Sequence, residues 1–165
     1  SKDEAPIITK AIINAGRKHN FTTISASTLD FIRIENKIPL YNKELTENHN
    51  PLEANLQASI SDNKGCYIGQ EVIARINTYQ KLQRRLVQIH FDTNDLPMPG
   101  SKLICHEKNI GYITSIQHSF RQGQAIGLGY VQLADYQHDA VVVAKHKGSM
   151  IQGKISEPEK VNARV

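Results

Sequence analysis

"LVQIHF", residues 86–91, is the stretch that decides the fold, because a two-residue alternation of apolar and polar side chains starts there. Val87, Ile89 and Phe91 form the apolar side, with one polar residue between each pair. Successive side chains of a strand point to opposite faces of a sheet, so the alternation predicts a β-strand. Before Gln83 the apolar residues recur mostly at helical spacing, and after it they alternate.

Five further stretches alternate in the same way and are separated by turn-forming residues. They cover residues 101–107, 110–119, 124–133, 140–146 and 149–156. The connections at 107–109 and 121–123 have the composition of hairpin turns. Six short strands at this spacing predict a small antiparallel β-barrel that is closed or nearly closed. The glycines of this half are expected at its turns and bends.

The first half of the chain predicts helices, with one short strand among them. The helices are expected at 6–15, 27–36 and 50–56 and from Gly69 onward, and the strand is expected at 21–25. The stretch 27–36 also alternates tolerably as a strand, which remains an alternative. The fold class that follows is α+β. It combines a helix-containing part at 1–83 with a six-stranded antiparallel β-barrel at 84–165.

Two of the expected helices carry capping signals. Ser27 is followed three residues later by Asp30, which fits a capping box. Asn50 can cap the stretch that follows it, because Pro51 suits the first helical position and Glu53 can reach back to the cap. These signals set the expected starts of the second and third helices.

Composition narrows the function classes. The 165 residues are 39% hydrophobic with mixed charge, which is typical of an ordinary globular protein. No apolar run approaches the roughly 20 residues that cross a bilayer. The first residues lack a signal-peptide layout, so a cytoplasmic setting is expected. Cys66, Cys105 and seven histidines form no CxxC, HxxxH or HExxH spacing, so no resident metal is expected.

The net charge of +4 permits an anionic partner such as RNA, a phosphorylated cofactor or a polyglutamyl tail. The basic residues are scattered, apart from a cluster of Lys81, Arg84 and Arg85, so ordinary solvated surface is the simpler interpretation. With six Tyr, four Phe and no Trp, the chain has little material for a base-stacking platform. Direct nucleic-acid binding is therefore a minor hypothesis.

Cys66 lies in "NKGCYIGQE" at an expected loop-to-helix junction, beside a lysine. A helix N-terminus presents unpaired N–H groups and about half a positive charge, and Lys64 adds a full charge. Both favour the thiolate over the thiol. Gly65 and Gly69 let backbone N–H groups approach an anion closely. Such a junction could hold a carboxylate or phosphate, receive a reactive carbon, or ligate iron–sulfur chemistry. The alternative is a buried free cysteine beside a structural turn.

The junction also carries a family resemblance. "KGCYIGQE" (64–71) resembles the K-G-C-[FY]-x-G-Q-E signature of the YgfZ-type folate-binding proteins. These are relatives of the glycine-cleavage T-protein, an aminomethyltransferase, and include a mitochondrial iron–sulfur assembly factor. The corresponding motif of T-proteins proper is similar to K-G-D-F-I-G-R-E, which has no cysteine. Cys66 and Gln70 therefore favour the YgfZ branch.

Flanking stretches extend the resemblance over nearly the whole chain. "RIENKIPLYNKEL" (33–45) resembles the family's R-[IL]-E-x-G-x-P-x-x-G-x-E-L, and "NPLEANL" (50–56) resembles its N-P-x-E-A-x-L. "IGYITS" (110–115) and "AIGLGYV" (125–131) resemble the T-protein C-terminal barrel. Residues 1–83 would then be the C-terminal part of the folate-binding domain.

The chain departs from the family pattern in two ways. Asn36 and Lys37 stand where the family usually has small residues, and Asn42 stands where it commonly has glycine, which affects local turn geometry. Family members are also much longer and begin with a segment that supplies much of the folate cavity. The chain is therefore expected to be a fragment or a short member, whose apolar surface pairs with the missing N-terminal half or a second copy.

The resemblance implies tetrahydrofolate binding and a role in maintaining certain iron–sulfur enzymes, including tRNA-thiolating ones. We therefore expect a folate-dependent factor for iron–sulfur cluster assembly or repair, and thereby for tRNA modification, with iron–sulfur client proteins as partners. The competing hypothesis is an aminomethyltransferase that moves a one-carbon unit to tetrahydrofolate. An RNA-binding module built on the barrel is the third.

Five residues are expected at the folate site. Lys64 and Cys66 are the catalytic candidates: the lysine would attract the folate carboxylate or an anionic intermediate, and the thiolate would lie near the one-carbon position or ligate sulfur or iron. Glu35 lies where T-protein-like members place a pterin-binding carboxylate, which can accept two hydrogen bonds from the pterin N–H edge. Gln70 and Arg75, on the helix that follows Cys66, are expected to reach the pocket.

Two neighbouring charges are expected to be structural. Arg33 should pair with Glu71 or with another acid. Glu71 itself lies in the first turn of its helix, where a carboxylate stabilises the helix dipole. Neither residue is therefore counted among the folate ligands.

Overall fold

The computed structural model describes residues 2, 4–61, 63–79, 82–135, 139–146 and 148–156. The chain divides into two compact units, Ser1–Asp30 and Phe31–Val165. The second unit keeps residues 31–83 together with the barrel. The functional boundary at 83/84, between a folate-binding domain and the barrel, stays a prediction.

The first unit is built on helix α1 (Ala5–Gly16), which confirms the first expected helix. A short 3-10 turn, η1 (Arg17–His19), follows it. The chain then folds back, because the Phe21 N–H donates to the carbonyl of Gly16 at 3.2 Å. Residues 21–25 are not a strand, so that prediction is wrong. A lone extended segment forms no ladder without a neighbouring strand.

Helix α2 (Ala26–Glu35) confirms the second expected helix and corrects its expected cap. The hydroxyl of Ser25 accepts a hydrogen bond from the Thr28 N–H at 3.1 Å, so Ser25 is the capping residue. Ser27 lies inside the helix, past the position that faces the free N–H groups. The capping box expected from Ser27 and Asp30 is therefore wrong by two residues.

Residues 50–56 form a capped turn, and the helix expected there is wrong. The capping contacts do form: the Glu53 N–H donates to Asn50 Oδ1 at 3.0 Å, and the Asn50 N–H donates to the Glu53 carboxylate at 3.3 Å. Asn55 then adopts a left-handed φ of 60°, which ends the helical conformation. The first barrel strand supplies the next partners, because the Leu86 N–H donates to the Glu53 carbonyl at 2.8 Å and Asn55 Nδ2 donates to the Leu86 carbonyl at 2.7 Å.

A 3-10 turn, η2 (Gln57–Ser59), and helix α3 (Gln70–Tyr79) complete the part before the barrel. Helix α3 confirms the fourth expected helix. Gly69, immediately before it, has a φ of 90°, a conformation that favours glycine. No helix among the described residues is long and apolar enough to span a bilayer.

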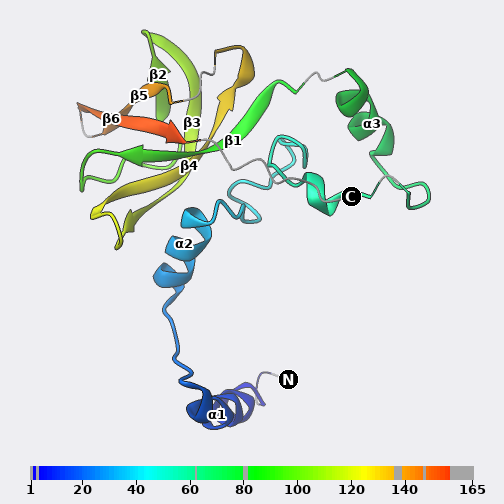
Figure 1. The fold of residues 1–165 in the computed structure, drawn as a ribbon, viewed down its shortest axis with the longest axis vertical. Helices are drawn as coiled ribbons and strands as arrows, with labels where there is room; N and C mark the ends of the chain where they lie inside the picture. The colour runs from blue at the N-terminus through cyan, green and yellow to red at the C-terminus, as the bar shows by residue number, and fades with distance from the viewer. Residues whose placement is uncertain are drawn as a thin grey trace. The chain divides into compact units, whose positions relative to one another are not determined.

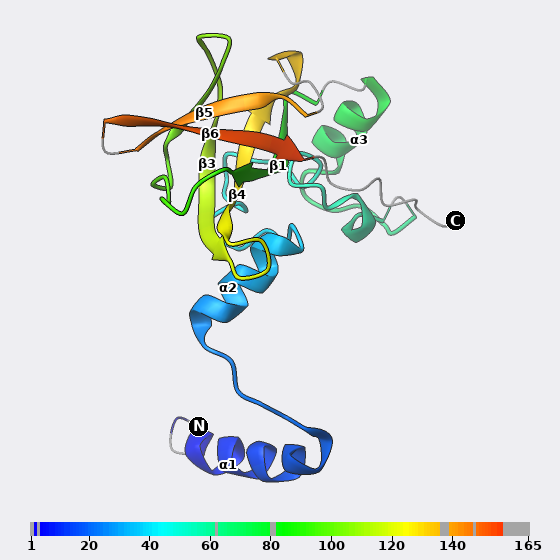
Figure 2. The same ribbon diagram turned by 60° about the vertical axis from the view of Figure 1, so that its left-hand side comes forward.

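All six expected strands form, and they close into a barrel (Figure 1). They are β1 (Arg84–Phe91), β2 (Lys102–Cys105), β3 (Lys108–Ser119), β4 (Gln124–Gln132), β5 (Val141–His146) and β6 (Ser149–Ser156), with a 3-10 turn, η3 (Leu133–Asp135), after β4. The antiparallel order is β1-β4-β3-β2-β5-β6, and β1 closes the barrel by pairing with both β4 and β6. In Figure 2, β5 and β6 run across the direction of β3 and β4. The α+β class with a six-stranded antiparallel barrel is confirmed.

Two hairpin turns lie close to their expected positions. Between β2 and β3 the turn is His106-Glu107, with φ of 46° and 63°, while Lys108 already pairs with Cys105. Positive φ at both central residues is typical of a type I′ hairpin. The turn therefore precedes the expected 107–109 by one residue. Between β3 and β4, Gly123 has a φ of 65°, as a turn glycine expected at 121–123 would.

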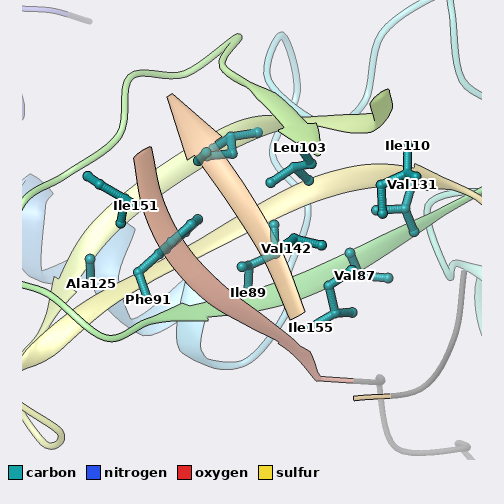
Figure 3. Close-up of a cluster of buried hydrophobic side chains, with 12 residues drawn as sticks. Val87, Ile89, Phe91, Leu103, Ile110, Ala125, Val131, Val142, Ile151 and Ile155 are labelled. Carbon is teal, nitrogen blue, oxygen red and sulfur yellow. The ribbon is translucent and has the colours of Figure 1, made fainter. Parts of the chain in front are cut away.

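Apolar side chains fill the barrel interior (Figure 3). The alternation in β1 is confirmed, because Val87, Ile89 and Phe91 all point inward and are almost fully buried. The outer face of β1 and β4 is buried as well, in a cluster of Ile34, Leu86, Ile126, Leu128 and Tyr130. Residues 31–56 supply the cover for this outer face, so β1 packs on both sides.

Glycines allow β3 and β4 to approach each other closely. A Cβ on Gly111 would lie 1.9 Å from the carbonyl oxygen of Tyr130, and one on Gly129 would lie 2.5 Å from that of Tyr112. No real Cβ tolerates such distances, so both positions require glycine. Their role is close packing within the wall, not turn formation.

Candidate functional site

A buried carboxylate fastens the segment before the barrel to the barrel wall. Glu44 is fully buried, and its carboxylate accepts hydrogen bonds from Arg33 Nη1 at 3.0 Å and the Leu40 N–H at 2.9 Å. On the barrel side, the Thr114 and Ser115 hydroxyls donate to it at 2.7 and 2.6 Å. Four donors stabilise the buried charge, so Glu44 has a structural role.

A β-bulge in β3 aims those two hydroxyls at the carboxylate. The register with β4 shifts between Ile113 and Ser115, which leaves Thr114 as the extra residue. The Ser115 hydroxyl also accepts a hydrogen bond from Arg33 Nη2 at 2.7 Å. Of the two partners expected for Arg33, the structure shows an acid other than Glu71. Sequence reasoning missed Glu44, although it is the last acid of the "RIENKIPLYNKEL" stretch.

A second polar cluster lies on the same outer face. The His49 ring stacks on Tyr130 with ring centroids 3.6 Å apart, and its Nε2 lies 2.6 Å from the Tyr112 hydroxyl. Its Nδ1 is buried without a hydrogen bond, 3.5 Å from the Glu53 carboxylate. Burial lowers the pKa of His49, although Glu53 opposes the shift, so the ring is neutral at pH 7. Burial also raises the pKa of Tyr112 and of Tyr130.

Glu35, the predicted pterin ligand, ends α2 and is half-buried. Its carbonyl accepts a hydrogen bond from Gln88 Nε2 at 3.0 Å, which fixes the helix end to β1. Its carboxylate lies 3.7 Å from Arg121 Nε on the β3–β4 turn. A long ion pair with an exposed arginine is weak, so a ligand with two N–H donors could replace it.

The junction before α3 exposes the two catalytic candidates. Cys66 is exposed, so the alternative of a buried cysteine does not hold in this structure. Lys64 Nζ lies 4.7 Å from the Tyr67 ring centroid, a cation–π contact between the residues on either side of Gly65 and Cys66. Ile68 and Val72 are exposed apolar side chains next to them, at 104% and 57%. The junction therefore combines an accessible thiol, a cation and an uncovered apolar surface.

Helix α3 carries the remaining predicted ligands. Gln70 is half-buried at its first position, whereas Glu71 and Arg75 are exposed one turn apart. Glu71 lies in the first turn, as expected of a residue that stabilises the helix dipole. No group of three metal-ligating side chains occurs among the residues that the structure describes.

The structure brings some predicted site residues together and separates others. Lys64, Cys66 and Gln70 share one short stretch, while Glu35 lies at the end of α2 against the β3–β4 turn. In Figure 1 the C-terminal end of α2 and the start of α3 lie apart. The folate-binding and catalytic roles of all five residues stay predictions.

Two of the three positions that depart from the family pattern keep a glycine-like backbone. Lys37 and Asn42 have φ of 58° and 62°, in the left-handed region that glycine adopts most readily. Asn42 stands where a glycine is common in the resembled family, and asparagine tolerates this conformation well. The substitutions therefore preserve the local turn at these positions.

Comparisons with known proteins agree with the barrel and with the wider glycine cleavage T-protein superfamily, while the YgfZ branch stays a prediction. Residues 84–161 match the family described as "Glycine cleavage T-protein C-terminal barrel domain". An aminomethyltransferase of Halalkalibacterium halodurans is 27% identical over 94% of this chain and 43% of its own length. One of Symbiobacterium thermophilum is 31% identical over 84% and 36%. The chain thus spans less than half the length of these relatives.

A solved structure supports the fold. The crystal structure of the glycine cleavage system aminomethyltransferase T from Bartonella henselae has a TM-score of 0.70, covering 78% of this chain and 36% of that one at 21% identity. At that identity the likeness concerns the fold alone. Together, the matches support the glycine cleavage T-protein superfamily for this chain.

Proposed function

We propose that this chain belongs to a tetrahydrofolate-binding protein that acts in iron–sulfur cluster assembly or repair, and thereby in tRNA modification. The observation that carries the proposal is the exposed Cys66 beside Lys64, in a stretch that matches every position of the YgfZ-type signature. The T-protein pattern K-G-D-F-I-G-R-E has an aspartate at the position of Cys66. A superfamily member with a thiol there gains sulfur chemistry that a carboxylate cannot supply.

The roles of the residues follow from where they lie. Lys64 provides the positive charge that a folate carboxylate or an anionic intermediate needs, and Cys66 presents the thiolate to the one-carbon position or to sulfur or iron. Gln70 and Arg75 line the same helix. Glu35, whose carboxylate forms a long ion pair with Arg121, accepts the pterin N–H groups.

Partners and setting belong to the same proposal. The exposed Ile68 and Val72 beside the thiol support a contact with another folded part, either a further segment of the whole protein or a second copy. Iron–sulfur client proteins would then approach Cys66 itself. We place this activity in the cytoplasm.

Tetrahydrofolate titration of this chain, and of the whole protein to which it belongs, tests the proposal. Cys66→Ala, Lys64→Ala and Glu35→Gln are compared with Glu47→Gln, an exposed acid away from the site. We expect Lys64→Ala and Glu35→Gln to weaken folate binding and Glu47→Gln to leave it unchanged. Equal binding by all four variants would contradict the site.

Complementation tests the role of the thiol. In a strain that lacks the protein, we expect the wild-type protein to restore the activity of iron–sulfur enzymes and Cys66→Ala to fail, while both accumulate to the same level. Full restoration by Cys66→Ala would exclude the thiolate role and leave the folate proposal standing.

Aminomethyl transfer is the second candidate function, favoured by the names of the curated relatives. The variant Cys66→Asp separates the two candidates, because it introduces the aspartate of the T-protein pattern at this position. A transferase should keep or gain one-carbon transfer to tetrahydrofolate in Cys66→Asp. A sulfur-dependent factor should lose its function as completely as in Cys66→Ala.

A further inference from the structure

A groove lies where β1 begins and β4 ends. Leu86 of β1 pairs with Tyr130 of β4, and both are almost fully buried beneath the turn that contains Glu53. Two register positions further along, on the same face of the sheet, Arg84 pairs with Gln132. Among the described residues, the groove at this rung is lined by Leu82, Gln83, Arg84, Gln132 and Ala134 and has a volume of about 490 Å³.

The cation in this groove has no partner of its own. Arg84 is half-buried, and its guanidinium forms no hydrogen bond or ion pair with the part of the chain that the structure describes. Two carboxylates of the same region bind other groups. Glu53 accepts from the Asn50 N–H. Asp135, next to Ala134, accepts from Lys108 Nζ through Oδ1 at 2.6 Å, while its Oδ2 is buried without a hydrogen-bond partner. A half-buried guanidinium without a carboxylate is incompletely compensated, and an anion would complete it.

We propose that this groove, the Arg84 groove, binds a small molecule that carries a carboxylate or a phosphate group. The planar guanidinium can hold either group through two parallel hydrogen bonds. The Gln83 and Gln132 amides supply neutral donors and acceptors beside it, and Leu82 and Ala134 supply apolar walls. The volume falls within the ~300–1,000 Å³ typical of small-molecule sites. This site is separate from the junction at Cys66, so it does not depend on the proposed function.

The pKa of His49 should show whether the Arg84 groove is occupied. Burial is the main cause of the lowered pKa of His49 and of the raised pKa of Tyr112. The charge of Arg84 adds to the lowering at His49 and opposes the rise at Tyr112. An anion bound to Arg84 would offset that charge. We therefore expect the pKa of His49 to rise when the groove is filled, while the stacking on Tyr130 and the nearby Glu53 stay as they are.

The test follows the ¹⁵N-labelled chain by NMR during titration with inorganic phosphate or glutarate, at an ionic strength held constant with chloride. We expect the backbone amides of residues 82–84 and 132–134 and the side-chain amides of Gln83 and Gln132 to shift together. Arg84→Gln should weaken binding about tenfold or more, as the loss of a charge-assisted hydrogen bond does. Arg121→Gln, which removes an exposed arginine from the β3–β4 turn, should leave it unchanged.

A second variant keeps the test decisive if Arg84→Gln is poorly folded. Gln132→Glu places a carboxylate on the neighbouring strand directly opposite Arg84, where it satisfies the guanidinium internally. Binding of both probes should then be lost while the thermal stability is kept. Tighter binding of phosphate than of glutarate assigns a phosphate ester as the ligand, and the reverse order assigns a carboxylate.

Three results would overturn the proposal. The first is an absence of shifts at the groove amides at saturating probe. The second is equal weakening by Arg84→Gln and Arg121→Gln, which would show general charge screening. The third is unchanged binding in Gln132→Glu.

Discussion

Residues 31–56 and residues 63–79 both precede the barrel and both carry charged side chains, but the structure treats the two stretches in opposite ways. In the first, Arg33 and Glu44 are buried and fixed to the barrel wall. In the second, Lys64 and Cys66 are exposed on a turn. The difference teaches that the family-like motifs of this chain divide into those that build the fold and those that are left available for chemistry.

The two stretches also differ in their histidine content. The first stretch carries the stacked His49, whose pKa is lowered by burial, and so it responds to pH through the fold. The second stretch, residues 63–79, contains no histidine. Changes in the first stretch should therefore alter stability, and changes in the second should alter function.

The strongest way to break this comparison is to remove the buried carboxylate. We expect Glu44→Ala to lower the free energy of unfolding by about 3–5 kcal/mol, because Arg33 loses the buried carboxylate that it pairs with and the Thr114 and Ser115 hydroxyls lose their acceptor. Urea denaturation measures the change. The exposed Glu47→Ala is the matched control and should shift stability by less than about 0.5 kcal/mol. Equal effects would show that the network is not structural.

A glycine pair sharpens the comparison. We expect Gly111→Ala to destabilise the barrel by about 1–3 kcal/mol, because the added methyl group would meet the carbonyl of Tyr130 at 1.9 Å and force the strands apart. Gly65→Ala, in the junction, meets nothing within 4 Å and should leave the midpoint of thermal unfolding unchanged. A large loss in Gly65→Ala would mean that the junction is packed after all.

The pH dependence that His49 adds to the free energy of unfolding involves one proton. Its effect should therefore be smaller than the loss of stability in Glu44→Ala or Gly111→Ala. The pKa of folded His49 lies below its unfolded value of 6.5, so the unfolded chain binds more protons as the pH falls below 6.5. Stability should therefore decline from pH 6.5 downward. Denaturation curves of the wild-type chain and His49→Gln, recorded from pH 7.5 to 5, measure this term. The variant should lack it, and an identical slope in both proteins would contradict the burial effect.

The smallest stability effect is expected where the functional effect is largest. Cys66→Ala and Lys64→Ala should each change the free energy of unfolding by less than about 0.5 kcal/mol, because both side chains are exposed. Chemical denaturation beside the complementation assay separates the two readouts. A loss of more than that by Cys66→Ala would place the cysteine among the structural residues.

The barrel could be read from the sequence because its signal is local. Alternation in β1 and the turn residues between strands fix each strand within a few residues, and short hairpins leave few ways to pair them. The helix expected at 50–56 failed for a non-local reason. Its capping contacts formed, but the carbonyl of Glu53 and the side chain of Asn55 found partners on Leu86, which no local pattern indicates.

The candidate site was predictable only in part. The accessible junction followed from a motif of eight adjacent residues, but the buried network did not. Glu44 and His49 gain their roles from Ser115 and Tyr130, which lie more than 70 positions further along the chain. The Arg84 groove likewise joins residues 82–84 to residues 132 and 134, which are neighbours only through the pairing of β1 with β4.

Closure by β1 has a consequence for how the chain acquires its shape. The first strand of the barrel pairs with the last. Residues 88–91 therefore cannot form this pairing until residues 153–156 have been synthesised. Such distant pairings slow the search for the native topology. The capped turn at residues 50–56 is synthesised earlier and binds the backbone of Leu86 directly. It can cover the edge of β1 at Leu86 against pairing with strands of other chains until the barrel is complete.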